Sequence, residues 1–107
     1  MPNVYVNAKK DLTTASATTL YTAPSLTTSI IKSIVVSEDS GNADSITVTL
    51  TDASSNVFSL FKTKAVSANA TVELLTAPLV VQTGEAVKVT AATGNRLHVI
   101  ASVLEIS

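Results

Sequence analysis

The hydrophobic residues of this chain recur with a period of two, which is the spacing of an extended strand. Residues 45–52, SITVTLTD, show this most clearly, because Ile46, Val48 and Leu50 alternate with threonines. The 3.6-residue period of an amphipathic helix is not found in any stretch of the sequence. The sequence therefore predicts an all-β protein.

Turn-forming residues divide the chain into short segments at intervals of about 8–12 residues, a spacing typical of a β-sandwich or barrel. We expect one β-sandwich, either jelly-roll-like or immunoglobulin-like, with about eight or nine short antiparallel strands. Residues 1–107 are expected to form a single domain, in which residues 1–17 are a candidate N-terminal arm. The expected strands are residues 4–9, 18–23, 29–36, 45–52, 57–63, 71–76, 78–82, 86–91 and 96–106.

Three of these strands, at residues 29–36, 57–63 and 96–106, carry apolar side chains on both faces. A two-sheet sandwich buries only one face of each sheet, so the second face needs a cover. The cover is either the chain's own turns and N-terminal arm, or further copies in a homo-oligomer, most simply a trimer. The candidate interface residues are Ile30, Ile34, Val36, Phe58, Leu60, Ile100 and Leu104.

The residues that usually carry catalysis or bind metals are scarce. The chain has no cysteine and one histidine, His98, which we expect to be a half-exposed strand residue or an interface hydrogen-bonding group. We therefore expect no enzymatic activity, no catalytic residue, no metal and no cofactor. Residues 38–45, EDSGNADS, could bind calcium, but their spacing does not match an EF-hand and favours a solvated acidic turn. Glu73, Glu85 and Glu105 are expected to be outward-facing polar positions.

Charge and hydropathy exclude two classes of partner. The formal net charge is −1 and the seven Lys and Arg residues are scattered, so no basic patch for nucleic acid is expected. No apolar run approaches the ~18 residues of a membrane span. The N-terminus lacks the pattern of a secretory signal, so we expect synthesis and folding in a cytoplasm. Charged residues make up only 14% of the chain, which suits a surface packed against neighbours.

Four segments carry a resemblance to a known family: LYTAP (20–24), IIKSIVVS (30–37), ELLTAPLVVQTGEAVKVTA (73–91) and VLEI (103–106). In this order they resemble small virion structural proteins of tailed bacteriophages, including phages of cyanobacteria. The resemblance runs from about Thr18 to Ile106, and it does not cover the residues before Thr18. These strings bear on the fold, so they identify no binding residue.

The resemblance implies a non-enzymatic, all-β virion protein that is made in the host bacterial cytoplasm. The favoured role is a capsid cement or decoration protein that binds across capsomers and stabilises the head. A neck, tail or baseplate component is the alternative. A third possible function, which comes from the sequence and not from the resemblance, is a host-surface or carbohydrate-binding module. The expected partners are its own copies, as a homotrimer, and the major capsid protein or another virion protein.

Overall fold

The computed structural model describes residues 3–107, and these residues form nine β-strands and no helix. The described part of the chain accordingly offers no helix suited to crossing a membrane. The all-β prediction is confirmed. The strands are β1 (Asn3–Leu12), β2 (Thr18–Thr22), β3 (Thr28–Glu38), β4 (Asp44–Thr51), β5 (Val57–Val66), β6 (Thr71–Glu73), β7 (Leu79–Val81), β8 (Ala86–Ala91) and β9 (Leu97–Ile106).

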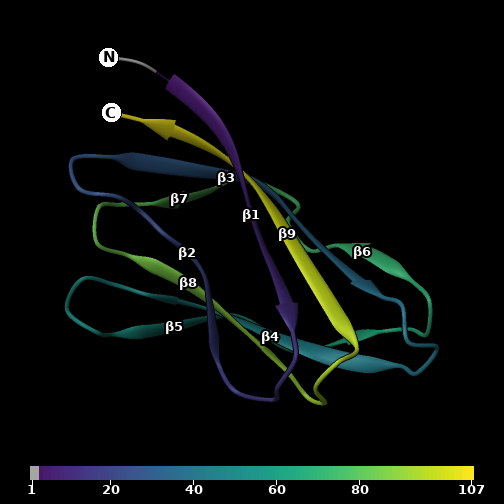
Figure 1. Cartoon of the computed structure of the whole chain (residues 1–107). Coiled ribbons are helices and arrows are strands. Elements are labelled where there is room, and N and C mark those ends of the chain that lie inside the picture. Colours follow the sequence, from purple (N-terminus) through teal and green to yellow (C-terminus); the bar gives the residue numbers. More distant parts are fainter. Residues whose placement is uncertain (1–2) are drawn as a thin grey trace.

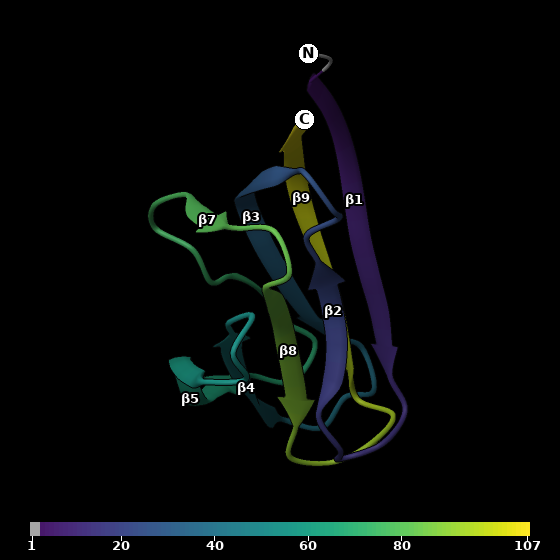
Figure 2. The same cartoon turned by 90° about the vertical axis from the view of Figure 1, so that its left-hand side faces the viewer.

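The strands form two antiparallel sheets that lie one over the other as a sandwich (Figures 1 and 2). Sheet A has the strand order β1-β9-β3-β6, and β7 also pairs with β3, further along the same edge. Sheet B has the order β2-β8-β4-β5. The predicted β-sandwich is therefore confirmed.

The order of the strands identifies the type of sandwich. The pairs are nested along the chain: β4 pairs with β5, β3 with β6 and β7, β2 with β8, and β1 with β9. In addition to these pairs, β9 lies beside β3 in sheet A and β8 lies beside β4 in sheet B. Nested pairs combined with these two neighbours are the jelly-roll arrangement. In an immunoglobulin fold the first two strands share a sheet, whereas here β1 and β2 lie in different sheets.

Every second residue of the central strands fills the space between the sheets. On β9, Leu97, Val99 and Val103 have no exposed surface, and on β4 the same holds for Ile46 and Val48. These are the residues that the period-two pattern places inward. Burying a Val, Leu or Ile side chain stabilises a fold by roughly 1.5–3 kcal/mol, so this layer is the main stabilising element of the sandwich.

A β-bulge changes which side chains of β3 face the core. The register of β3 against β9 shifts between Ile31 and Ser33, so β3 carries one extra residue there. Beyond the bulge, Ile34 and Val36 lie on the same side as Ile31, fully buried. Their predicted place on the second face together with Ile30 is therefore wrong, because simple alternation cannot register an inserted residue.

Two further register shifts reorient β5. Its pairing with β4 is irregular on both sides of Val48. As a result Leu60 and Phe61, which are neighbours in sequence, both pack against the core, while Phe58 is 53% exposed. The candidate interface residue Leu60 therefore packs against the core, because the register shifts interrupt the simple alternation of β5.

The candidate N-terminal arm contains a regular strand. β1 pairs with β9 at ten successive positions, from Asn3 opposite Ile106 to Leu12 opposite Leu97, and forms one edge of sheet A. Residues 13–17 connect it to β2. Residues 1 and 2 of the candidate arm lie outside the described residues.

Candidate interaction surface

A row of apolar side chains crosses the outer face of sheet A. The register places Tyr5 of β1 opposite Leu104 of β9, Leu104 opposite Ile30 of β3, and Ile30 opposite Val80 of β7. Residues that are directly opposite in a sheet lie on the same face. Tyr5 is 74% exposed and Val80 is 50% exposed, so both ends of the row are open to solvent.

A second apolar pair lies two rows further along the same face. Ile100 of β9 is opposite Val35 of β3, and this pair is flanked by Lys9 on β1 and Glu73 on β6. Ile100 is 47% exposed. Together the two rows form a surface that we call the apolar band, which consists of Tyr5, Leu104, Ile30, Val80, Ile100 and Val35.

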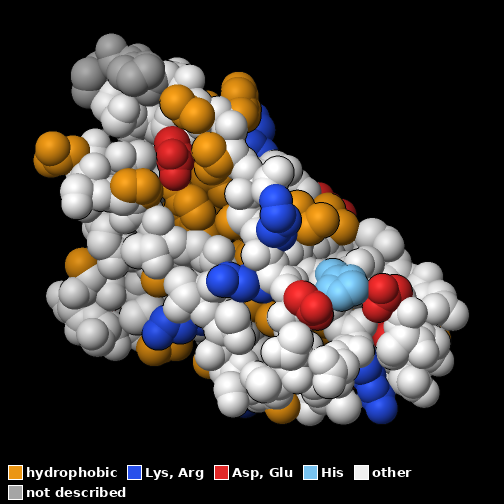
Figure 3. Space-filling model, in the orientation of Figure 1, with side chains coloured by type: hydrophobic (Ala, Val, Ile, Leu, Met, Phe, Trp, Pro, Cys, Tyr) orange, Lys and Arg blue, Asp and Glu red, His pale blue; other side chains and the backbone are white. Residues whose placement is uncertain are grey.

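The members of the apolar band do not take part in the core. Ile30, Val35 and Leu104 are partly exposed, and they are not among the partly buried residues, such as Val72 and Leu79, that pack against the buried cluster. In Figure 3 hydrophobic side chains reach the surface around the upper parts of β1 and β9, with basic side chains among them. This face is therefore apolar beyond what the sandwich itself requires.

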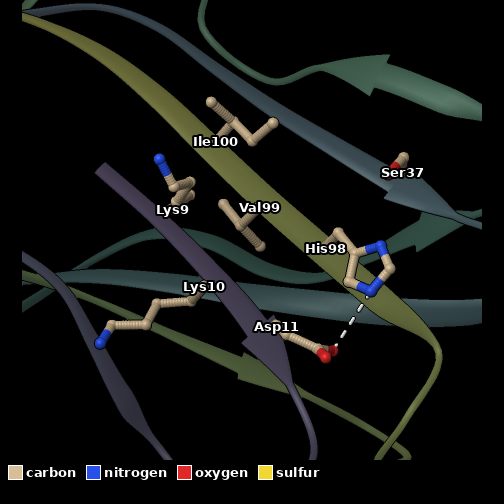
Figure 4. Close-up of a pocket in the computed structure, with 7 residues that line it drawn as sticks. All are labelled: Lys9, Lys10, Asp11, Ser37, His98, Val99 and Ile100. Atoms are coloured by element: carbon tan, nitrogen blue, oxygen red, sulfur yellow. Dashed lines mark ion pairs between the residues drawn. The ribbon is translucent and has the colours of Figure 1, made fainter. Parts of the chain in front are cut away.

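The other end of this face is charged. The Nε2 atom of His98 lies 3.2 Å from Oδ1 of Asp11, and its Nδ1 atom lies 3.6 Å from Oδ2 of Asp39. Figure 3 shows the histidine between two acidic side chains. His98, Asp11, Ser37 and neighbouring residues line an open pocket of about 390 Å³ between β1, β9 and β3 (Figure 4). The side chain of His98 is 42% exposed, so it is a half-exposed strand residue.

The acidic turn after β3 has a structural role, because its carboxylate Glu38 connects two loops. The carboxylate of Glu38 accepts hydrogen bonds from the backbone N–H groups of Ser40, Gly41 and Asn69, at 2.8, 3.1 and 3.0 Å. Burial by itself would raise the pKa of Glu38, but these bonds and one from the Ser40 hydroxyl lower it to about 2. The ionised carboxylate therefore ties the β3–β4 turn to the loop before β6.

The three carboxylates of this turn do not converge on one point. Glu38 is engaged by backbone donors, Asp39 faces His98, and Asp44 accepts a hydrogen bond from the Thr93 N–H at 3.1 Å. Within residues 3–107 no group of three or more His, Cys, Asp or Glu side chains is placed to hold a metal ion. The geometry therefore does not favour the calcium alternative.

The seven candidate interface residues separate into three groups. Ile30, Ile100 and Leu104 lie together in the apolar band. Phe58 is exposed on sheet B, and the other three (Ile34, Val36 and Leu60) face the core. The band also contains three residues that the sequence did not single out: Tyr5, Val35 and Val80. Only the strand pairing, which the sequence does not reveal, brings them together.

Comparisons with known proteins bear on the fold. No protein-family model and no curated protein matches this sequence. A chain in the structure of infectious bursal disease virus, Gx strain, has a similar fold, with a TM-score of 0.58 and 10% sequence identity. The match covers 96% of this chain and 32% of that one, so this chain spans about a third of its length. A chain in the structure of the Gt strain has a TM-score of 0.48 and 11% sequence identity, and the match covers 98% of this chain and 30% of that one. This chain thus shares its β fold with part of a chain from a virus.

Proposed function

We propose that this protein is a virion structural protein without enzymatic activity. The observation that carries the proposal is the jelly-roll strand order, in a chain whose fold resembles part of a chain from a virus structure. Double-sheet jelly rolls are a recurrent architecture of viral capsid domains. The resemblance of residues 18–106 to phage structural proteins points in the same direction.

The apolar band supplies the surface by which such a protein would bind its neighbours. Val80 and Ile100 are about half exposed, and covering one such side chain contributes on the order of 1 kcal/mol. A contact of this size is weak for one copy. On a particle with many repeated sites, several weak contacts made by one oligomer combine into firm attachment.

Within this class we favour a cement or decoration protein on the head of a tailed phage. In this role the apolar band covers joints between capsomers, and the partners are the major capsid protein and further copies of this chain. The protein is made in the host bacterial cytoplasm and resides in the virion. A neck, tail or baseplate position is the alternative, in which the same band meets a tail-side partner.

A carbohydrate-binding role is less well supported by the arrangement of the aromatic residues. Tyr5 lies on β1 of sheet A and Phe58 on β5 of sheet B, so the two exposed aromatic side chains do not share a face. Tyr21 is buried and Phe61 packs against the core. A stacking platform on one face is therefore lacking among residues 3–107.

Immunogold labelling of intact virions, with antibody raised against this chain, tests the proposal. Gold over the head supports the cement or decoration role, and gold at the neck or tail supports the alternative position. The absence of gold from every particle of the virus that encodes the protein would overturn the structural role. Binding of added Val80→Lys chain to particles that lack the protein, compared with Val57→Lys as control, then tests the apolar band. Val57 is 64% exposed on the other sheet.

A further inference from the structure

Sheet edges are places where another strand can add, and three edges of this sandwich are interrupted. β2 has five residues and a register shift, and β6 and β7 have three residues each. β5 is long, but it has two register shifts, a positive φ of 49° at Thr63 and the exposed lysines Lys62 and Lys64. Short strands, bulges and edge lysines are features that prevent edge-to-edge pairing.

β1 is neither short nor bulged, although it also carries two exposed lysines, Lys9 and Lys10. It pairs with β9 at ten successive positions without a register shift, and Asn3–Leu12 contains no proline and no residue with positive φ. β1 pairs with no described strand other than β9, and Figure 2 shows none beyond it on its outer side. Val4 and Tyr5 on this strand are 47% and 74% exposed. β1 thus presents a long, regular row of backbone groups to a further strand.

We propose that β1 pairs antiparallel with β1 of a second copy, across a two-fold axis at Asn7. The two copies of sheet A then form one continuous sheet. This contact goes beyond the virion role, and it does not depend on that role.

Two arguments favour a second copy of this chain as the partner of β1: its β1 strand is long and regular, and the resulting assembly closes at two copies. An added strand must be long and regular along its whole length, and β1 itself meets this condition. The other ten-residue edge, β5, does not meet it because of its bulges. A β1–β5 contact would also leave one edge open on each copy and propagate, whereas a β1–β1 contact closes at two copies.

The charges of β1 favour the register centred on Asn7. In this register Tyr5 faces Lys9 of the second copy, and Asn3 faces Asp11. An ammonium beside an aromatic ring is a favourable neighbour. A register centred on Lys10 would place two lysines directly opposite each other, which is unfavourable. Registers centred on Val6 or Ala8 oppose no like charges, but they lack the Tyr5–Lys9 pair. The side chain of Asn7 is exposed, so it can occupy the axis.

A cysteine placed at the axis tests the contact directly. The chain has no cysteine, so Asn7→Cys introduces one thiol per copy. Directly opposite residues of antiparallel strands have Cα atoms about 4.5–5.5 Å apart, which is within the range of a disulfide. Mild oxidation of the full chain should therefore give disulfide-linked dimer on a non-reducing gel. Val57→Cys, on the opposite sheet, is the control and should give at least about tenfold less dimer at equal concentration.

A charge swap at the same position provides a second readout. Asn7→Lys and Asn7→Asp each place like charges on the axis, and each should weaken the dimer by up to about fivefold. An equimolar mixture of the two variants pairs opposite charges and should restore the dimer. Sedimentation equilibrium of wild-type protein should give twice the chain mass of 11.0 kDa.

Three results would overturn the two-fold contact. They are a wild-type mass of one or three chains at all concentrations, Asn7→Cys crosslinking no better than Val57→Cys, and no recovery in the mixture. A mass of three chains would instead support the trimer suggested by the sequence. None of these results bears on labelling of virions, so the two proposals can fail separately.

Discussion

Tyr21 on β2 and Glu105 on β9 are joined by a hydrogen bond that crosses from sheet B to sheet A. The Tyr21 hydroxyl donates to Oε2 of Glu105 and is also 2.7 Å from the Ser29 hydroxyl on β3. Burial, together with the neighbouring Glu105 carboxylate, raises the pKa of Tyr21 to about 12. The expected outward placement of Glu105 is wrong, because Glu105 is opposite the fully buried Ser29 and shares its face.

Removal of this hydroxyl should lower stability. Tyr21→Phe leaves Glu105 and Ser29 without their shared partner in a largely buried place, at a cost of about 1–3 kcal/mol. Urea unfolding at pH 7 measures the loss. Tyr5→Phe removes the same atom from a side chain that is 74% exposed and should have little effect. Equal effects of the two substitutions would show that the cross-sheet bond does not stabilise the fold.

A methyl group at Gly94 should also be costly. A Cβ atom on this residue would lie 2.5 Å from the backbone carbonyl oxygen of Thr13, since the β8–β9 loop packs closely on the β1–β2 loop. Gly94→Ala must push the two loops apart, and we expect a loss of about 1–3 kcal/mol in the free energy of unfolding. The exposed neighbour Ala92 provides the control: Ala92→Ser should change stability by less than about 0.5 kcal/mol. An unchanged melting temperature for Gly94→Ala would contradict the close packing of these loops.

The stability of the protein should fall in acid because of Glu38. Its pKa is lowered from 4.5 to about 2, so the folded state holds the carboxylate more firmly ionised than the unfolded chain does. This contribution is complete above pH 4.5 and is lost as the pH falls toward 2. Hydrogen bonds also lower the pKa values of Glu73 and Asp52 against the effect of burial, which adds to the same trend.

Glu38→Gln isolates this effect. The variant should be less stable than wild type at pH 7, and the difference should shrink as the pH falls toward 2, because the wild-type carboxylate then becomes progressively protonated. Urea unfolding midpoints of wild type and of Glu38→Gln, measured from pH 7 to pH 2, give the pH dependence of stability for each protein. Parallel curves with a constant offset would exclude Glu38 as a source of the acid dependence.

Two lysine substitutions separate the core from the apolar band. Leu60 packs against the core, so Leu60→Lys should lower stability by more than about 2 kcal/mol. Val80 is 50% exposed on the outer face, so Val80→Lys should change the melting temperature little. Thermal unfolding by circular dichroism distinguishes the two. A large loss for Val80→Lys would show that this face is covered within the chain itself.

Periodicity and turn residues are enough to predict the fold class and most of the strands. Alternation on β9 and β4 predicts which side chains are buried, because the extra residues of the bulges lie in their partners β3 and β5, and a period of two therefore maps directly onto the two faces of β9 and β4. The nine strands also lie close to their expected positions, because glycine and proline mark most of the turns between them. The jelly roll was one of the two sandwich types that the sequence allowed.

Which apolar residues remain on the surface depends on how the strands pair in the folded protein. The bulge after Ile31 moves Ile34 and Val36 into the core, and the shifts in β4–β5 pairing turn Leu60 inward. A bulge depends on the fit between two strands, so one strand's sequence does not reveal it. The apolar band likewise joins residues as distant in sequence as Tyr5 and Leu104, because strand order and register, not local sequence, determine which side chains become neighbours.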